Sequence, residues 1–141
     1  MDFVVFKGQK YPVDIIEPRY VKWEKEIRQL TINNPNIGSI SQIEGLKSTN
    51  LTRLSIINSQ ISEIKGLDNL KNLKSLSLLG NNISEIKNLD HLTNLEHLRL
   101  CSNKIREIKG LDNLTKLSKL DLSSKKSEKL RDWTCSIILQ S

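Results

Sequence analysis

The sequence predicts an α/β solenoid of about five coils, in which each coil contributes one strand to a curved parallel sheet on the concave face. The first observation behind this prediction is a 22-residue period between residues 61 and 122, in which Leu67, Leu89 and Leu111 occupy equivalent positions and the other core leucines and isoleucines recur in phase. The second is a short segment in each repeat where apolar and polar residues alternate, the pattern of a strand with one buried face. The third is a cluster of aromatic residues at the N-terminus, where a stack of coils needs a cover.

Residues 1–26 are predicted to form an N-terminal cap built from a hairpin and a helix. Phe3–Phe6 and Tyr11–Asp14 are expected to pair as antiparallel strands around residues 7–10. Pro18 suits the first turn of a helix, and one face of that helix would carry Tyr20, Trp23 and Ile27. A ligand pocket is the alternative role for the aromatic cluster, but its position at the unrepeated end favours capping.

Residues 27–124 are predicted to form the repeats, with strands at 29–33, 53–57, 75–79, 97–101 and 119–123. The return paths carry leucines at spacings of three, which suits turns and short 3₁₀ segments better than long helices. Asn81 and Asn103 follow the strands, where a buried amide can satisfy the backbone groups of adjacent coils. The repeat degenerates beyond residue 124, so residues 125–141 are expected to form a degenerate C-terminal cap or tail.

The composition places few limits on the partner. The formal net charge of +6 and the pI near 9.4 permit contact with acidic proteins, nucleic acid or anionic lipid. Part of the excess positive charge lies in the segment after residue 124, where a solvated tail is the simpler interpretation. The sequence contains neither an apolar run long enough to span a membrane nor a recognisable signal peptide, so we expect a cytoplasmic protein that does not enter the membrane.

The sequence offers no support for catalysis, and we expect no enzymatic activity, no cofactor and no bound metal. His91 and His97 have no nucleophile motif or acidic cluster around them, and phosphate-binding and zinc-protease motifs are absent. Cys101 and Cys135 form neither a CxxC pair nor a Cys/His pair with metal-ligand spacing. A lone cysteine within an apolar strip is more often inert than reactive.

The repeated unit LxxLxxLxLxxNxIxxIxxL closely resembles the leucine-rich repeat family over residues 27 to about 133. Its length is similar to that of the class typified by a phosphatase regulatory subunit and by bacterial internalins. The resemblance implies a curved solenoid whose non-leucine strand positions bind protein partners. Internalins begin with an export signal, so intracellular adaptors are the closer analogy. The chain departs from the pattern at Pro35, Ser59 and Lys125, which replace the asparagine, and in the short turn at 46–51.

If the leucines point inward, alternate strand residues form three columns on the concave face. The first column is Gln29, Arg53, Ser75, His97 and Lys119. The second is Thr31, Ser55, Ser77, Arg99 and Asp121. The third is Asn33, Ile57, Leu79, Cys101 and Ser123, and its apolar members are expected to form an exposed strip beside basic residues. The predicted partner-binding residues are therefore Arg53, Ile57, Leu79, His97, Arg99, Cys101, Lys119 and Asp121. The alternative is that these apolar residues are isolated or covered by loops.

The preferred functional hypothesis is a non-enzymatic module that binds a protein partner through this face, as an adaptor or regulatory subunit. One alternative is a basic protein that associates with RNA, although the concave face lacks aromatic residues interleaved with the basic ones for base stacking. Another is a self-associating structural solenoid. We expect a monomer, and the third hypothesis requires a homodimer formed through residues 137–139 at the C-terminal end.

Overall fold

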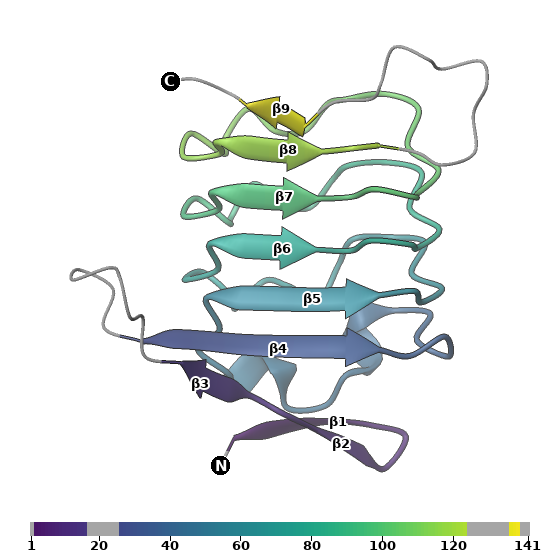
Figure 1. Ribbon diagram of the computed structural model, residues 1–141, viewed down its shortest axis with the longest axis vertical. Helices are drawn as coiled ribbons and strands as arrows, with labels where there is room; N and C mark the ends of the chain where they lie inside the picture. The colour runs from purple at the N-terminus through teal and green to yellow at the C-terminus, as the bar shows by residue number, and fades with distance from the viewer. Residues whose placement is uncertain (1, 17–25, 124–135, 139–141) are drawn as a thin grey trace.

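The computed structural model describes residues 2–16, 26–123 and 136–138 (Figure 1). These residues form a two-stranded sheet, β1–β2, and a seven-stranded sheet in the order β3 to β9. The strands of the larger sheet lie one above another on one side of the molecule, and the return segments lie behind them. No helix in the described part of the chain is long and apolar enough to cross a membrane.

The N-terminal hairpin is confirmed, but its second strand differs from the prediction. β1 (Phe3–Phe6) pairs antiparallel with β2 (Gln9–Pro12), not with Tyr11–Asp14. The difference follows from the turn, because Lys7 and Gly8 both have positive φ (47° and 80°) and close the hairpin with only two residues. The end of the expected second strand belongs instead to β3 (Asp14–Ile16), which pairs antiparallel with β4 at the edge of the larger sheet.

The helix predicted for the N-terminal cap falls mostly on residues 17–25, which lie outside the described residues. Of the residues assigned to its apolar face, only Ile27 is described. Ile27 was expected on that helix, but it is the first residue of β4 (Ile27–Asn33) and is buried in the sheet. Pairing of Ile16 with Ile27 extends the ladder of β3 and β4 to that point.

Five parallel strands form the body of the sheet: β4, β5 (Arg53–Ile57), β6 (Ser75–Ser77), β7 (His97–Arg99) and β8 (Lys119–Asp121). β6, β7 and β8 are shorter than predicted, because the chain bends after the third residue of each strand. Backbone hydrogen bonds to the next coil continue beyond this bend. The Leu78 N–H donates to Arg99 O (2.9 Å), and the Gly80 N–H donates to Cys101 O (3.0 Å). Four complete turns connect the five strands, and the path after β8 lies largely outside the described residues, so a fifth full coil is not confirmed.

The edge of the sheet after β8 is occupied by a strand of the same chain. β9 (Ser136–Ile138) runs antiparallel to β8, with Ile137 opposite Leu120 and Ile138 opposite Lys119. The backbone groups that a further parallel coil would use are therefore paired with the C-terminal segment.

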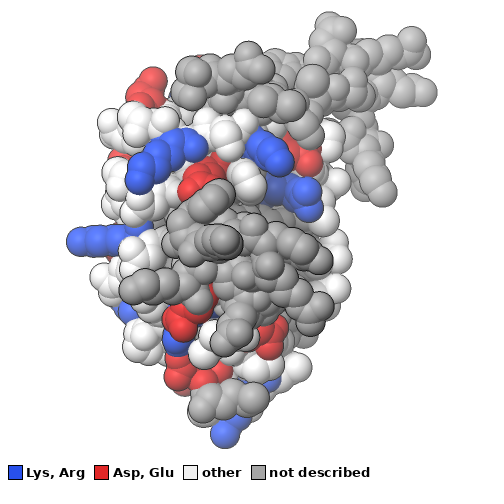
Figure 2. All heavy atoms as spheres, turned by 60° about the vertical axis from the view of Figure 1, so that its left-hand side comes forward, with Lys and Arg blue, Asp and Glu red and all other residues white. Residues whose placement is uncertain are grey.

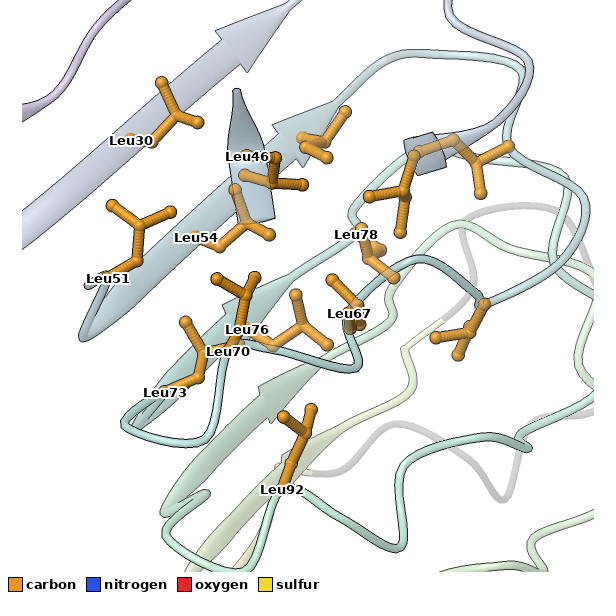
Figure 3. Close-up of a cluster of buried hydrophobic side chains, with 14 of the residues drawn as sticks. Leu30, Leu46, Leu51, Leu54, Leu67, Leu70, Leu73, Leu76, Leu78 and Leu92 are labelled. Atoms are coloured by element: carbon orange, nitrogen blue, oxygen red, sulfur yellow. The ribbon is translucent and has the colours of Figure 1, made fainter. Parts of the chain in front are cut away.

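The core consists of the leucines and isoleucines of successive coils, stacked between the sheet and the return paths (Figure 3). Leu54, Leu76 and Leu98 lie in register on adjacent strands and are each at most 1% exposed. The labelled leucines of the return paths point toward those of the strands. No single coil can enclose such a core alone, so the coils stabilise one another by burying each other's apolar faces.

Buried asparagine amides join the coils, as the sequence predicts. Asn81, 6% exposed, donates from Nδ2 to Ile56 O (3.0 Å) in the preceding coil and to Leu78 O (3.0 Å) in its own. Its Oδ1 accepts from the Ile61 N–H (3.1 Å). Asn103 repeats this arrangement one coil later, with Oδ1 accepting from the Ile83 N–H (2.9 Å). These amides satisfy backbone groups that the bend would otherwise leave unpaired.

The return paths consist of turns and 3₁₀ segments, as predicted from the leucines at spacings of three. Two segments are regular 3₁₀ helices, η1 (Ile40–Gln42) and η2 (Leu46–Ser48). In the regular coils the same geometry continues as single turns, such as the bond from the Leu70 N–H to Leu67 O (2.9 Å).

Each regular coil also has two corners with left-handed backbone, which the sequence analysis did not identify. Asn58, Gly80 and Ser102 share the first corner, and Gly66, Asn88 and Gly110 share the second. A Cβ at Gly80 would lie 2.7 Å from Asn58 Oδ1, and one at Gly110 would lie 2.8 Å from Ile86 O. Apart from Ser102, these corner residues are glycine or asparagine, for which positive φ has a low cost.

Candidate functional site

The face of the sheet opposite the leucine core, called here the open face, carries the predicted columns in register. Pairing places Gln29, Arg53, Ser75, His97 and Lys119 side by side on successive strands, so the first column is confirmed. Thr31, Ser55, Ser77, Arg99 and Asp121 are aligned in the same way, so the second is confirmed too. The 22-residue period alone sets this alignment between β5 and β8, because parallel strands pair without a shift between coils.

The open face is hollowed over β6, β7 and β8. The hollow has a volume of about 490 Å³ and is lined by Ser75, Leu76, Ser77, His97, Leu98, Arg99, Lys119, Leu120 and Asp121. Four predicted binding residues thus meet in one depression: His97, Arg99, Lys119 and Asp121. Ser75 and Ser77 were placed in the columns but not among the predicted binding residues. Their small side chains, in line with larger ones on β7 and β8, were the sequence signal for a depression at this position.

Basic side chains dominate the polar rim of this hollow. His97, Arg99 and Lys119 are exposed, and Arg53 is exposed on β5 at the head of the same column. The Arg99 side chain is 62% exposed, and its Nε lies 3.6 Å from Asp121 Oδ2. In Figure 2, Lys and Arg side chains are prominent in the upper half of the molecule, at the level of the C-terminal coils.

The electrostatic surroundings of His97 keep it neutral near physiological pH. Partial burial, then the charge of Lys119 on β8 and that of Arg53 on β5, lower the pKa of His97 below its usual 6.5, against the opposing effect of Glu96. Ser75, the partner of His97 on β6, carries no charge. The hollow therefore contains a titratable group that gains a proton most readily when an anion approaches.

Asp121 is the carboxylate of the hollow and is held ionised by its neighbours. Burial alone raises the pKa of Asp121, but hydrogen bonds from Cys101 and Ser123 and the charge of Arg99 outweigh it and lower the pKa below 3.8. The Ser123 hydroxyl and backbone N–H lie 3.1 Å and 3.3 Å from Asp121 Oδ1. This carboxylate offsets part of the positive charge of Arg99 and fixes one side of the hollow.

The exposed apolar strip predicted in the third column is not present. Ile57 and Leu79 are only partly exposed, and Cys101 is 6% exposed. The strands have ended at Leu79 and Cys101, and the bend packs these residues against adjacent coils. Cys101 Sγ lies 3.7 Å from Asp121 O, and burial, the main cause, raises the pKa of the Cys101 thiol. The buried Cys101 side chain therefore contacts Asp121 from the inner side. Ile57 and Leu79 are half-buried and form the margin of the open face.

Glutamates and lysines on the return side form a ladder of ion pairs. Lys87 Nζ lies 3.2 Å from Glu63 and 3.3 Å from Glu85, and Lys109 Nζ lies 3.5 Å from Glu85 and 3.3 Å from Glu107. All these side chains are well exposed, so each pair contributes little to stability. Hydrogen bonds and charge from Glu63 and Glu85 raise the pKa of Lys87, the expected consequence of such a ladder. Within the described ranges, His, Cys, Asp and Glu form no group of three that could hold a metal.

Comparisons with known proteins confirm the leucine-rich repeat resemblance. Residues 93–135 match the model described as leucine rich repeats in two copies. The crystal structure of an internalin (inlF) from Listeria monocytogenes is 37% identical with a TM-score of 0.56, over 64% of this chain and 26% of that one. An internalin C2 (inlC2) from the same organism is 27% identical with a TM-score of 0.47, over 68% of this chain and 52% of that one.

This chain thus spans about a quarter of the first internalin and about half of the second. No curated protein matches the sequence. Residues 93–135 of this chain thus match leucine-rich repeats, and proteins built from such repeats are typically protein-interaction modules.

Proposed function

We propose that this leucine-rich repeat chain is a non-enzymatic module that binds a protein partner through the open face of its sheet, as an adaptor or regulatory subunit. The single observation that carries the proposal is the hollow of about 490 Å³ over β6–β8, in which strand backbone and the serines of β6 lie between charged side chains at the rim. A depression of this kind, with convergent polar groups around it, is suited to the side chains of a partner.

The binding surface is centred on the hollow. His97, Arg99 and Lys119 provide exposed donors, and Asp121 provides one acceptor beside them. Arg53, Ile57 and Leu79 extend the surface toward the N-terminal coils and the margin of the sheet. Cys101, buried beneath Asp121, acts on the partner only through the position of that carboxylate.

Two further observations separate this proposal from its alternatives. Among the described residues that line the hollow there is no Phe, Tyr or Trp, whereas single-stranded RNA is usually held by stacking on such residues. Ile137 and Ile138, the residues considered for dimerisation, pair with β8 of their own chain. A homodimer in which a second copy pairs with β8 would first have to displace β9.

The test is recovery of partners from native lysate by the immobilised chain. Arg99→Glu reverses an exposed charge at the rim, and Ser77→Trp fills the hollow from its floor without removing any core atom. With either variant, the amount of partner recovered is expected to fall at least about tenfold, because hot spots lie at the centre of an interface. Leu79→Asp tests the margin and is expected to have a smaller effect.

The matched control is Lys104→Glu, which makes the same charge change on the exposed return path. Circular dichroism confirms that every variant retains its fold. Equal recovery by wild type, Arg99→Glu and Ser77→Trp would exclude the open face. A partner that proves to be RNA, with affinity falling steeply as salt increases, would favour the nucleic-acid alternative.

A further inference from the structure

Two cations of the open face have no ion pair among the described residues, whereas three lysines of the return side belong to a ladder of ion pairs. Within the described ranges, Arg53 and Lys119 have no ion pair, whereas Arg99 has Asp121. On the return side Lys65, Lys87 and Lys109 each contact at least one glutamate. Among the described residues, the open face therefore presents two cations, Arg53 and Lys119, without an ion pair, and carboxylates of a binding partner can supply one to each.

These two cations stand at the ends of one straight row. Arg53, Ser75, His97 and Lys119 are paired in sequence across β5, β6, β7 and β8. Adjacent strands are about 4.8 Å apart, so three strand spacings separate Arg53 from Lys119 by about 14 Å at the backbone. The two residues between them are a short serine and a neutral histidine that line the hollow.

An extended peptide has a side-chain repeat that matches this row. It rises about 3.3 Å per residue, so side chains four residues apart on one face are separated by about 13 Å. A peptide crossing the strands can thus place one carboxylate at Arg53 and another at Lys119. Its middle side chain then lies about 7 Å from each end, above the hollow between Ser75 and His97.

We infer that the partner presents an extended acidic segment that crosses the strands of the open face, with Asp or Glu side chains four residues apart at Arg53 and Lys119. The inference rests on the proposed function and specifies the chemistry of its partner. The guanidinium of Arg53 can hold its carboxylate through two hydrogen bonds, and Lys119 acts as a point charge. The middle residue of the segment is polar or acidic, because Ser75 and His97 both offer hydrogen-bonding groups to it.

Selection of displayed random ten-residue peptides against the folded chain tests this inference. Wild type is expected to enrich peptides with Asp or Glu at positions i and i+4. The double reversal Arg53→Glu/Lys119→Glu is expected to lose about 10- to 100-fold in affinity for these peptides, as measured by fluorescence anisotropy. The same variant is expected to enrich peptides with Lys or Arg at positions i and i+4 instead.

The matched control is Lys104→Glu/Arg106→Glu, which changes the net charge equally on the exposed return path and is expected to keep the acidic preference. An acidic preference that this control also abolishes would reflect net charge alone and would overturn the inference. So would acidic enrichment without the four-residue spacing, or a single-stranded RNA that binds the open face more tightly than any selected peptide.

Failure of the inference is distinguishable from failure of the proposed function. Selection could instead enrich peptides without acidic residues whose binding is lost in Arg99→Glu and Ser77→Trp. That result would overturn the inference and leave the open face as the binding surface. Peptides that bind equally to Arg99→Glu and Ser77→Trp would overturn both. Absence of any enrichment also overturns the inference, and partner recovery then decides the proposed function independently.

Discussion

Substitution of Asn81 by alanine tests how the coils are held together. The Asn81 side-chain amide accepts a hydrogen bond from the Ile61 N–H (3.1 Å) and donates one to Ile56 O (3.0 Å). Asn81→Ala therefore leaves the Ile61 N–H and Ile56 O without these partners. Each unsatisfied buried group costs about 1–3 kcal/mol. We therefore expect a loss on the order of 2–4 kcal/mol in the free energy of unfolding.

The other two acceptors of this amide limit the loss. Leu78 O keeps a hydrogen bond from Asn103 Nδ2 (2.8 Å), and Leu79 O keeps one from the Asn58 N–H (3.0 Å). These two carbonyls therefore stay satisfied in the variant and add little to the cost. At about 3 °C per kcal/mol for a chain of this size, Tm should fall by about 6–12 °C.

Urea unfolding followed by circular dichroism measures the difference directly. The control is Asn69→Ala, an exposed asparagine on the return path that should change stability by less than about 0.5 kcal/mol. Asn81→Ser should lie between alanine and wild type, because Ser59 occupies the same position one coil earlier and donates to Asn34 O (2.7 Å). An Asn81→Ala variant as stable as Asn69→Ala would refute the bridging role.

Three further predictions concern the corners, the outer charges and the hollow. Gly110→Ala should destabilise by more than about 2 kcal/mol in thermal unfolding, since its Cβ would lie 2.8 Å from Ile86 O, whereas Gly8→Ala, with open space around it, should cost only about 1 kcal/mol of backbone strain. Lys87→Met should leave the urea concentration at the unfolding midpoint unchanged, because its carboxylate partners are solvated; a clear decrease would contradict the assignment of a solvated ladder. Affinity for acidic peptides should increase as the pH falls through the pKa of His97 in the complex: the pKa of His97 lies below 6.5 in the free chain, a bound carboxylate raises it, and the added binding energy is lost as the pH rises through the raised pKa. In a pH titration of peptide affinity, His97→Gln should remove this dependence, and a retained dependence would exclude His97 as its source.

Much of the candidate site could be predicted because the solenoid repeats its backbone at a fixed interval. Once each coil pairs in register with the next, residues 22 positions apart must share a column, as His97 and Lys119 do. Their exposure also followed, because they alternate with leucines that face the core. The alternation of apolar and polar residues did not by itself show that Ser75 and Ser77 lie in a hollow; the signal was their small size beside larger residues in the same columns, and depth depends on the sizes of side chains on three strands together.

The errors occurred where the chain leaves regular structure. Cys101 was expected to be exposed because alternation was extended two residues beyond the end of β7. Past that end, exposure depends on the bend, on the left-handed residue Ser102 and on packing against Asp121 of the next coil. The second hairpin strand was misplaced for a similar reason, because the two-residue turn at Lys7 and Gly8 sets its register.

The sequence alone determined the coil, its period, its leucine core and the asparagine bridges, because these depend on spacing that a repeating backbone translates directly into position. Tertiary structure decided which outward residues are accessible, where the hollow lies and how the last parallel strand is covered. Those properties arise from contacts between coils and between distant segments, such as Ile137 opposite Leu120, and local periodicity does not encode such contacts. The regular part of the chain thus specifies a scaffold, and the packing of its outer side chains decides what that scaffold can bind.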